Sequence, residues 1–362
     1  MTARKTILIA PLDWGLGHAT RCMPVIDLLI SQGHRVILAG NGDSFCLLKE
    51  QYPDVTFYEL PGYNISYPAG KNASFYALLQ TPKILRTIKE ENKAIASIAA
   101  QEQIDLIISD NRYGVRHNSI KSILICHQIA LQAPPSARFM NPVFLKLHLR
   151  QIEHFDALWI PDEEGNTNLS GKLSHGISFT IPTTYIGILS RFSTFTKTDS
   201  LVDKLDFSIL IVLSGQEPQR THIEKELKNK LKDKTEKILL VQGKTERQNM
   251  LQEDNITIIS YLNSNDLFTA IQKANKLICR SGYSTIMDLA VLGKKAIFIP
   301  AEGQTEQEFL AAEMEKKGYA VHCPSKSLNI EDALRKVDNC KGFPVYPVNN
   351  ERLRKAIDEA LT

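Results

Sequence analysis

Long apolar runs are missing from this 362-residue sequence. No stretch approaches the roughly 18 uninterrupted apolar residues of a membrane-spanning helix, so none is expected. The run at Thr6–Ala10 is too short for the core of a signal peptide and predicts a first strand instead. The six cysteines are scattered and form no CxxC pair, so neither a zinc site nor a disulfide framework is predicted. This cysteine usage favours a cytoplasmic protein.

The sequence also has no large excess of positive or negative charge. Lys and Arg number 43 against 40 Asp and Glu, a net charge of +3, which gives no support for a nucleic-acid partner. Hydrophobic residues make up 43% and charged residues 23%, which excludes a disordered, collagen-like or coiled-coil chain. No solenoid repeat is present. At roughly 150 residues per domain, the length predicts two domains.

Short apolar runs alternate with amphipathic helical stretches throughout. Continuous apolar runs joined by helices predict parallel sheets that are covered on both faces. We therefore predict an α/β protein with two Rossmann-like domains that face a cleft. The runs expected as strands are Thr6–Ala10, Arg35–Ala39, Thr56–Leu60, Leu106–Ser109 and Ser122–Cys126 in the first half, and Ser208–Leu213, Lys237–Gln242, Thr257–Ser260, Leu277–Cys279 and Lys295–Pro300 in the second.

The domain boundary is expected in the weakly periodic segment between Tyr185 and Asp206. The first domain is then residues 1–190 and the second residues 206–345. Residues 346–362 follow the Pro-rich stretch FPVYPVNN and contain a last helix, which we expect to pack back on the first domain.

A glycine-rich turn, WGLGHATR, follows the first predicted strand. Backbone N–H groups gather at such a strand–helix turn and favour an anion or a close backbone approach by Gly15 and Gly17. The turn is neither GxGxxG nor a P-loop, and no acidic residue ends the second strand, which disfavours a dehydrogenase. His18 lies at the carboxyl end of the first strand, where open α/β sheets bind their ligands. The alternative is a histidine that caps or packs the helix.

The second half opens with a similar turn, LSGQEPQR. Ser214 and Gly215 follow a strand and precede a helix, so their N–H groups suit a diphosphate, to which Arg220 adds charge. A plain strand–helix turn is the alternative.

A third motif begins where a later strand ends, at Arg280, Ser281 and Gly282, and a helix starts at Ser284 and Thr285. This is another anion site, in which glycine permits close approach. The alternative for each residue is a solvated helix start.

Further polar residues of this motif suit the hydroxyl groups of a sugar or ribose. Asp288, one turn into the helix, suits a sugar or ribose hydroxyl. Gln304, Glu306 and Gln307, which follow the next strand, suit the hydroxyl groups of a sugar.

The third motif resembles the donor-binding signature of GT-B glycosyltransferases and is most similar to family 28. The family's RSGA…P…QQ pattern and its acidic position are matched here by Arg280, Ser281, Gly282, Ser284, Thr285, Asp288, Pro300 and Gln307. Its glycine-rich turn ending in histidine is matched by Gly15, Gly17 and His18. The sequence departs from the family's lipid II-forming enzyme, which has Glu at Asp288, a small residue at Tyr283 and a second Gln at Glu308.

The resemblance implies a glycosyltransferase that moves a sugar from a nucleotide-sugar donor, a UDP-sugar, to a hydroxyl of a glycan or lipid-linked acceptor. It implies inversion at the anomeric carbon, with no metal and no cofactor. The first domain would bind the acceptor and present His18 as the base. The donor-side residues would be Gly15, Gly17, Ser214, Gly215, Arg280, Ser281, Gly282, Ser284, Thr285, Asp288, Gln304, Glu306 and Gln307.

Two strand ends in the first half carry further polar residues. Asp110 would orient His18 as a carboxylate orients a catalytic imidazole, with Asn111 and Arg112 beside it. A surface turn is the alternative. His127 and Gln128 lie just past the next strand and would face the acceptor. The alternative is a packed or capping polar pair.

Residues 63–93 mix aromatics and leucines with lysines and an arginine, a composition that suits an anionic membrane surface. Peripheral contact with the inner face of the membrane is therefore expected; the alternative is an amphipathic helix packed on the sheet. Two alternative functions remain: a sugar-nucleotide epimerase of the same fold, and a non-catalytic nucleotide-sugar-binding subunit of a membrane glycosyltransferase.

Overall fold

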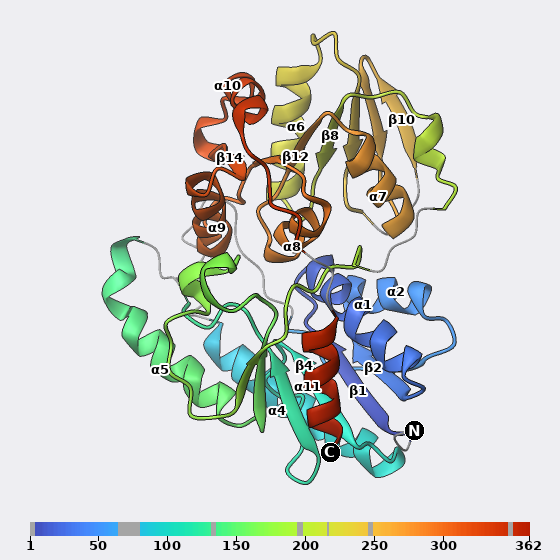
Figure 1. Cartoon of the computed structure of the whole chain (residues 1–362), viewed down its shortest axis with the longest axis vertical. Helices are drawn as coiled ribbons and strands as arrows, with labels where there is room; N and C mark the ends of the chain where they lie inside the picture. The colour runs from blue at the N-terminus through green and yellow to red at the C-terminus, as the bar shows by residue number, and fades with distance from the viewer. Residues whose placement is uncertain are drawn as a thin grey trace. The chain divides into compact units, whose positions relative to one another are not determined.

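The computed structural model describes residues 4–63, 80–131, 135–193, 198–215, 217–244, 249–346 and 350–362 (Figure 1). The chain divides into two compact units. Unit 1 comprises Met1–Ser190 and Val348–Thr362, and unit 2 comprises Arg191–Pro347. Each unit is built around its own seven-stranded sheet with helices on its faces. The predicted fold class, two parallel α/β domains, is confirmed.

The sheet of unit 1 is wholly parallel, with strand order β3-β2-β1-β4-β5-β6-β7. Its central strands are buried along nearly their whole length because helices cover both faces, which explains their continuous apolar sequences. The strands are β1 (Thr6–Pro11), β2 (Arg35–Gly40), β3 (Thr56–Glu59), β4 (Leu106–Asp110), β5 (Lys121–Ile125), β6 (Ala157–Ile160) and β7 (Thr183–Tyr185).

The register of the three central strands places their carboxyl ends together. Pro11 at the end of β1 pairs with Asp110 at the end of β4, and Asp110 pairs with Ile125 at the end of β5. Neighbouring strands lie about 4.8 Å apart, so residues at or just past these ends lie within side-chain reach of each other.

The helices of unit 1 are α1 (Leu16–Ser31), α2 (Gly42–Gln51), α4 (Thr81–Gln101), α5 (Asn141–Ile152) and α11 (Glu351–Leu361), with short 3-10 turns η1 (Pro135–Met140), η2 (Gly165–Thr167) and η3 (Gly171–Leu173). Ile95 and Ile98 of α4 pack against apolar side chains of β1, β2 and β4. Most of the segment predicted to meet a membrane, residues 64–79, lies outside the described residues. The part within α4 is an amphipathic helix packed on the sheet.

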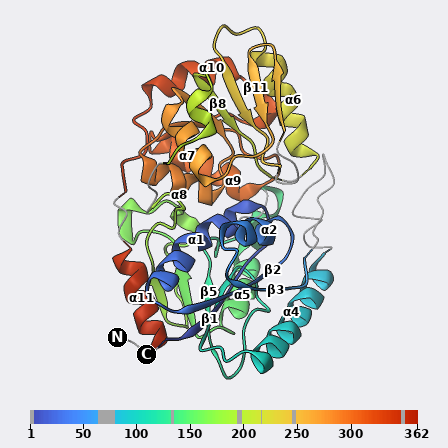
Figure 2. The same cartoon turned by 90° about the vertical axis from the view of Figure 1, so that its right-hand side faces the viewer.

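Helix α11 comes from the far end of the chain and belongs to unit 1. Leu353, Ala356 and Ile357 are buried, and Asp358 accepts a hydrogen bond from Gln32 of α1 at 3.2 Å. Figure 2 shows the strands of unit 1 with α4 on one side and α11 on the other. The expectation that a C-terminal helix returns to the first domain is therefore met.

The sheet of unit 2 has strand order β10-β11-β9-β8-β12-β13-β14 and is parallel except for the edge pair β10–β11. Its strands are β8 (Ile209–Val212), β9 (Ile238–Val241), β10 (Met250–Glu253), β11 (Ile256–Ile259), β12 (Lys276–Cys279), β13 (Ala296–Phe298) and β14 (Ala320–His322).

The helices of unit 2 are α6 (Gln219–Leu231), α7 (Ser264–Lys273), α8 (Tyr283–Leu292), α9 (Thr305–Lys316) and α10 (Ile330–Lys336), with 3-10 turns η4 (Leu201–Lys204), η5 (Ser325–Ser327) and η6 (Val337–Asn339). Side chains of α6 and α10 join those of the sheet in one apolar core cluster. Across the described parts of both units, every helix is too short or too polar to cross a membrane.

Candidate functional site

A buried histidine–carboxylate pair lies at the carboxyl edge of the unit 1 sheet. Asp110 ends β4 and is fully buried, and its Oδ2 lies 3.1 Å from Nδ1 of His18. His18 lies in the first turn of α1, and its side chain keeps 14% of its surface exposed. The two residues are 92 positions apart in sequence, so the parallel pairing of β1 with β4 is what joins them.

Arg21 fills the space between this pair and a second imidazole. Its guanidinium binds both carboxylate oxygens of Asp110, with Nε 2.7 Å from Oδ2 and Nη2 in contact with Oδ1. Nη2 also lies 2.8 Å from Nδ1 of His18, and Nη1 lies 2.8 Å from Nδ1 of His127. Asp110, His18 and His127 are therefore joined through one side chain that is 2% exposed.

The charges in this cluster oppose one another. Burial raises the pKa of Asp110, but the positive charge of Arg21 and the contacts with His18 outweigh it and hold the pKa well below its usual range. Burial lowers the pKa of His18, the charge of Arg21 lowers it further, and Asp110 opposes both. Cys22 directs its Sγ at Asp110 from 3.7 Å, and burial keeps this thiol protonated by raising its pKa. At neutral pH, His18 is neutral beside an ionised Asp110.

Asn111, predicted on the acceptor side, has an uncommon backbone conformation and a buried side-chain oxygen. Its φ of 57° lies in the left-handed region, which non-glycine residues seldom adopt. Its Oδ1 is buried and has no hydrogen-bond partner within the described part of the chain. A buried acceptor of this kind needs a donor, and a ligand hydroxyl would supply one.

The other predicted acceptor-side residues differ in whether they lie at the cluster. His127 is buried and joined to the cluster through Arg21, and Gln128 beside it is half-buried. Arg112 has a different role from the one predicted. It is completely buried and directed away from the cluster, where Nε donates to Glu91 and Nη2 donates to the carbonyl of Pro61. Its donors are engaged inside the protein, so it holds loops together.

The start of α1 is open to a ligand. Gly15 has a φ of 80° and no side chain caps the helix. A Cβ added there would meet nothing within 4 Å, so the backbone at Gly15 is approachable. No acidic residue lies in this turn. Anion binding or close backbone approach at this turn stays a prediction.

In unit 2, the start of α8 has the same open character. Gly282 caps the helix without a side-chain bond, and a Cβ there would also meet nothing within 4 Å. Ser284 and Thr285 in the first turn are half-buried, and the turn has no acidic residue. The positive end of the helix dipole therefore lies at an unobstructed backbone position.

Arg280 brings a buried positive charge to this position. It is 4% exposed, and Nη1 donates to the carbonyl of Ile299 at 2.9 Å. Its Nε has no partner within the described residues, and burial lowers the pKa of the guanidinium to about 10. A buried cation without a carboxylate beside it is costly. An anionic ligand at the start of α8 would reduce that cost.

A hydrogen-bonded network links α8 to the start of α9. Ser281 donates to the carbonyl of Gln307 at 2.8 Å, and the Gln307 side chain donates to Gln304 at 2.6 Å. Glu306 and Glu308 lie in the first turn of α9 and would repel an anion there. The predicted sugar-side residues therefore gather at a place that suits neutral hydroxyl groups.

The remaining predicted residues of unit 2 are partly engaged. Asp288 is 5% exposed and pairs with Nε of Arg191 at 3.2 Å. Ser214 and Gly215 form an open turn after β8, with a φ of 104° at the glycine. Arg220, expected to add charge to that turn, is buried and bound to Glu217 and Glu224, so its charge is compensated.

Two residues of these clusters were not predicted. Arg21 lies three residues after His18, a spacing that places both on one helix face, and this is the signal that could have found it. Arg191 lies 97 positions from Asp288, in a segment without periodicity, so nothing local identifies their pairing.

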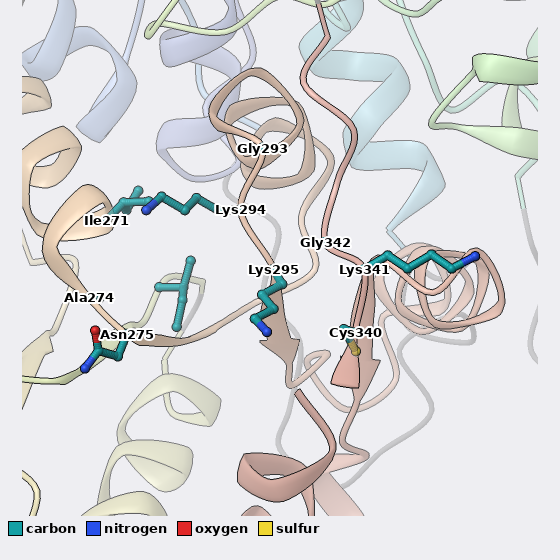
Figure 3. A pocket seen from close by; sticks show the side chains of 10 residues that line it. Ile271, Ala274, Asn275, Gly293, Lys294, Lys295, Cys340, Lys341 and Gly342 are labelled. Carbon is teal, nitrogen blue, oxygen red and sulfur yellow. The ribbon is translucent and has the colours of Figure 1, made fainter. Parts of the chain in front are cut away.

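A pocket of about 260 Å³ lies elsewhere in unit 2, at the amino ends of β12 and β13 (Figure 3). Its lysines support the ends of neighbouring elements: Lys294 donates to the carbonyl of Gln272 and Lys295 to that of Asp338. Open α/β sheets bind ligands at the opposite, carboxyl edge. We therefore assign this pocket no part in the site. Within the described residues, no group of three metal-ligating side chains is present.

Comparisons with known proteins find similarity to glycosyltransferases. Residues 210–358 match the glycosyltransferase family 28 C-terminal domain. A protein of Methanosarcina mazei named "Uncharacterized glycosyltransferase" is 23% identical over 341 residues, 86% of this chain and 84% of the relative.

Two further matches are one named transferase and one solved structure. A UDP-N-acetylglucosamine–N-acetylmuramyl-(pentapeptide) pyrophosphoryl-undecaprenol N-acetylglucosamine transferase of Thermosipho africanus is 32% identical over 114 residues, 31% of this chain and 32% of the relative. The crystal structure of MurG from Acinetobacter baumannii has a TM-score of 0.55 at 15% identity, covering 98% of this chain and 99% of that one.

Proposed function

The chain is a family 28-like glycosyltransferase of the GT-B fold, and from this premise we propose that it moves a sugar from a nucleotide-sugar donor to a hydroxyl of an acceptor. The observation that carries the proposal is the His18–Asp110 pair, a neutral imidazole held against a buried carboxylate at the ligand-binding edge of unit 1. Unit 1 would bind the acceptor and unit 2 the donor.

The donor diphosphate would bind at the start of α8. Backbone N–H groups near Gly282 and the buried charge of Arg280 supply stabilisation that grows as negative charge develops on the leaving group. The Gln304–Gln307 network suits the sugar hydroxyls, and Asp288 suits the ribose. Because this positive charge belongs to the protein, the proposal requires no metal.

The transfer would be a single displacement. The acceptor hydroxyl loses its proton to Nε2 of His18, in the tautomer whose Nδ1–H donates to Asp110 and which leaves Nε2 unprotonated. The acceptor oxygen forms a bond to the anomeric carbon as the bond to the diphosphate oxygen breaks. The nucleoside diphosphate leaves with the bonding electrons, and the anomeric centre is inverted. Oδ1 of Asn111 is placed to accept a hydrogen bond from an acceptor hydroxyl.

A UDP-sugar is the donor that we propose. The support is the Thermosipho africanus relative, whose name specifies UDP-N-acetylglucosamine and whose similarity covers 114 residues. That name also specifies a lipid-linked acceptor, and a glycan or lipid-linked hydroxyl is the acceptor class that we propose here.

Membrane contact would be made through α5 and the turn before it. Phe139 is 80% exposed, and Val143 and Leu147 are each 52% exposed, at a spacing of four residues that forms one stripe. Arg138, Lys146 and Arg150 are exposed too, and no acidic residue lies between residues 138 and 152. An apolar stripe with basic residues is complementary to an anionic lipid surface. We propose that this stripe lies on the inner face of the membrane.

Vesicle sedimentation tests this surface. The protein should pellet with vesicles that contain phosphatidylglycerol and should stay in the supernatant with phosphatidylcholine vesicles. Replacing Phe139 and Leu147 by serine should abolish pelleting. Leu251→Ser, which removes a side chain of 59% exposure from unit 2, is the matched control and should pellet normally. Equal pelleting of both variants would exclude α5 as the contact.

Ligand-induced thermal stabilisation tests the donor site. A ligand at about 100 times its Kd adds roughly 2.7 kcal/mol to the free energy of unfolding. UDP or a UDP-sugar should raise the melting temperature, and Asp288→Ala should weaken that shift. If no nucleotide or nucleotide sugar stabilises the protein, the donor assignment is wrong.

Activity separates the transferase from the epimerase. The transferase releases UDP only when an acceptor is added, and His18→Ala should lower that release by about 100-fold or more. Conversion of the UDP-sugar to its epimer without any acceptor would favour the epimerase. Donor binding with unchanged biological activity in His18→Ala would favour a non-catalytic subunit.

A further inference from the structure

One buried cation, Arg21, contacts His18, Asp110 and His127 of the unit 1 cluster. We propose that Arg21 is the positioning residue of this site, which holds His18 in its neutral form and fixes Asp110 and His127 around it. The inference rests on the proposed function for its catalytic meaning, while the arrangement itself is a property of unit 1.

The geometry of Arg21 is that of a bridge. A guanidinium has five N–H donors in a rigid planar fork. In Arg21, Nε and Nη2 bind the two oxygens of Asp110, and the remaining contacts go to Nδ1 of His18 and Nδ1 of His127, each at 2.8 Å. These partners come from α1, from the end of β4 and from the residue pair after β5. A lysine has one nitrogen and cannot make these contacts together.

Burial is the largest cause that lowers the pKa of His18, and the position of the Arg21 charge adds to it. A buried histidine beside a carboxylate alone would gain a proton readily, because the imidazolium would be attracted by the negative charge. Here the guanidinium lies closer to Nδ1 of His18, at 2.8 Å, than the carboxylate oxygen, at 3.1 Å. The attraction of Asp110 is thereby offset. His18 stays neutral, and in the tautomer whose Nδ1–H donates to Asp110 its Nε2 can accept a proton from a hydroxyl.

The charged and titratable groups around His18 come from three elements. Arg21 and Cys22 lie on its own helix, Asp110 lies on β4, and His127 lies after β5. The thiol of Cys22 is neutral, because burial and the neighbouring Asp110 raise its pKa. Arg21 and Asp110 are therefore the two fixed charges that act on His18, and they act in opposite directions.

Substitution of each charge predicts opposite shifts. In Arg21→Gln, the cation that disfavours the imidazolium is gone and Asp110 remains, so the titration midpoint of His18 should rise by about one pH unit or more. In Asp110→Asn, the cation remains alone, so the midpoint should fall. NMR of the histidine rings follows these midpoints in the full chain without any substrate. His18→Gln identifies the signal.

Two further variants keep the inference testable if a single variant misfolds. Arg21→Gln combined with Asp110→Asn removes both charges and leaves no buried ion unpaired, and its midpoint should lie within about half a unit of the wild type, since the charges offset. Arg21→Lys keeps the charge but not the fork, so the midpoint should stay while kcat falls by about 10-fold.

The outcomes are decisive in both directions. Midpoints that move oppositely in Arg21→Gln and Asp110→Asn establish the role of Arg21, and a purely structural residue would not produce that pattern. A midpoint unchanged or lowered in Arg21→Gln would overturn the inference, as would a double variant that shifts like either single one. The acid limb of kcat/KM should move with the NMR midpoint. If the midpoints behave as expected but no sugar is transferred, the proposed function is wrong and the charge arrangement stands.

Discussion

At the scale of single residues, the most consequential side chain outside the site is Arg112. It is completely buried and pairs with Glu91 of α4, while Nη1 donates to Asn41 at 2.9 Å. Burial raises the pKa of Glu91, against the opposing charge of Arg112. This pair connects α4 to the loops after β2 and β4, which carry the edge of the sheet where His18 and Asp110 lie.

Arg112→Met should destabilise unit 1 by about 3–5 kcal/mol at neutral pH, because Glu91 is left buried without a counter-charge. The pKa of Glu91 would rise further above its ordinary value, so the folded variant would bind a proton more readily than the unfolded chain. Its stability should therefore fall as pH rises from 5 to 8, and the deficit against the wild type should be smallest at pH 5. Urea unfolding at several pH values measures this.

Arg86→Met is the matched control for that variant. Arg86 pairs with Glu90 on the same helix, but its side chain is 81% exposed, so its loss should cost less than about 1 kcal/mol at any pH. An equal effect of the two substitutions, or a deficit in Arg112→Met that grows toward acid pH, would contradict this account of the buried pair.

Sequence patterns predicted which strand ends carry the candidate site. They did not predict which partner each side chain contacts there. His18 and Asp110 could be paired because each ends or follows a strand expected to be central. Arg112 has the same local context as Asp110, and only the tertiary contact with Glu91 assigns it to the interior. Arg21 carries no strand-end signal, so its bridging position depends on the packing of α1.

At the scale of elements, the start of α8 carries the sequence motif that is proposed to bind the donor. Gly282 has a φ of −68° and ψ of 145°, which any residue adopts, and the space beside it is open. Neither backbone strain nor packing therefore requires glycine at this position. A phosphate that reaches the first-turn N–H groups, as proposed, would occupy the space of a side chain there.

Gly282→Ala should change the free energy of unfolding by less than about 1 kcal/mol, because the methyl group meets nothing in the folded protein. Nucleotide binding should weaken by about 10-fold or more, since the methyl group would separate the diphosphate from the helix. Titration calorimetry with UDP, alongside urea unfolding, measures both quantities.

Gly40→Ala provides the comparison. Its added Cβ would make ordinary contacts, the nearest at 3.8 Å from the ring of Phe45, and it lies at the end of β2 in unit 1. This variant should keep its stability and its nucleotide affinity. Loss of stability in Gly282→Ala that matches its loss of binding would show that the glycine is structural.

Sequence patterns missed α5, β6 and β7, which lie between residues 127 and 185, as well as β10, α9, β14 and α10 in unit 2. Strand β6 has only four residues, Ala157–Ile160, too few to show a pattern. Helix α5 exposes Val143 and Leu147, so its apolar residues surround the axis and obscure the 3.6-residue period. The longer buried strands β1, β2 and β4 present continuous apolar runs and were predicted within about a residue of their observed ends.

At the scale of the whole molecule, the two proposed roles belong to separate units. The groups proposed to bind the diphosphate all belong to unit 2, and the His18 cluster belongs to unit 1. Hydrogen exchange should therefore resolve them. UDP should slow exchange at the starts of α8 and α9, and the strands β1 and β4 should exchange as they do without ligand.

Ile357→Asp should produce the converse pattern. Ile357 of α11 is completely buried in unit 1, so a carboxylate there should speed exchange in β1 and α1 while unit 2 keeps its protection and binds UDP. Lys355→Asp, on the exposed face of the same helix, is the control and should leave both units unchanged. Faster exchange in α8 of the Ile357→Asp variant would contradict separable units.

The return of α11 to unit 1 also determines how this chain behaves when it is cut. The backbone leaves unit 1 after Ser190 and re-enters it at Val348, so a single cut in the first connection separates the sheet of unit 1 from a fragment that carries unit 2 and α11 together. That fragment keeps the buried face of α11, formed by Leu353, Ala356 and Ile357. Through this face it can stay bound to the fragment that carries the unit 1 sheet. A nicked enzyme should therefore copurify as one particle, and a split enzyme can use α11 as its reassembly point.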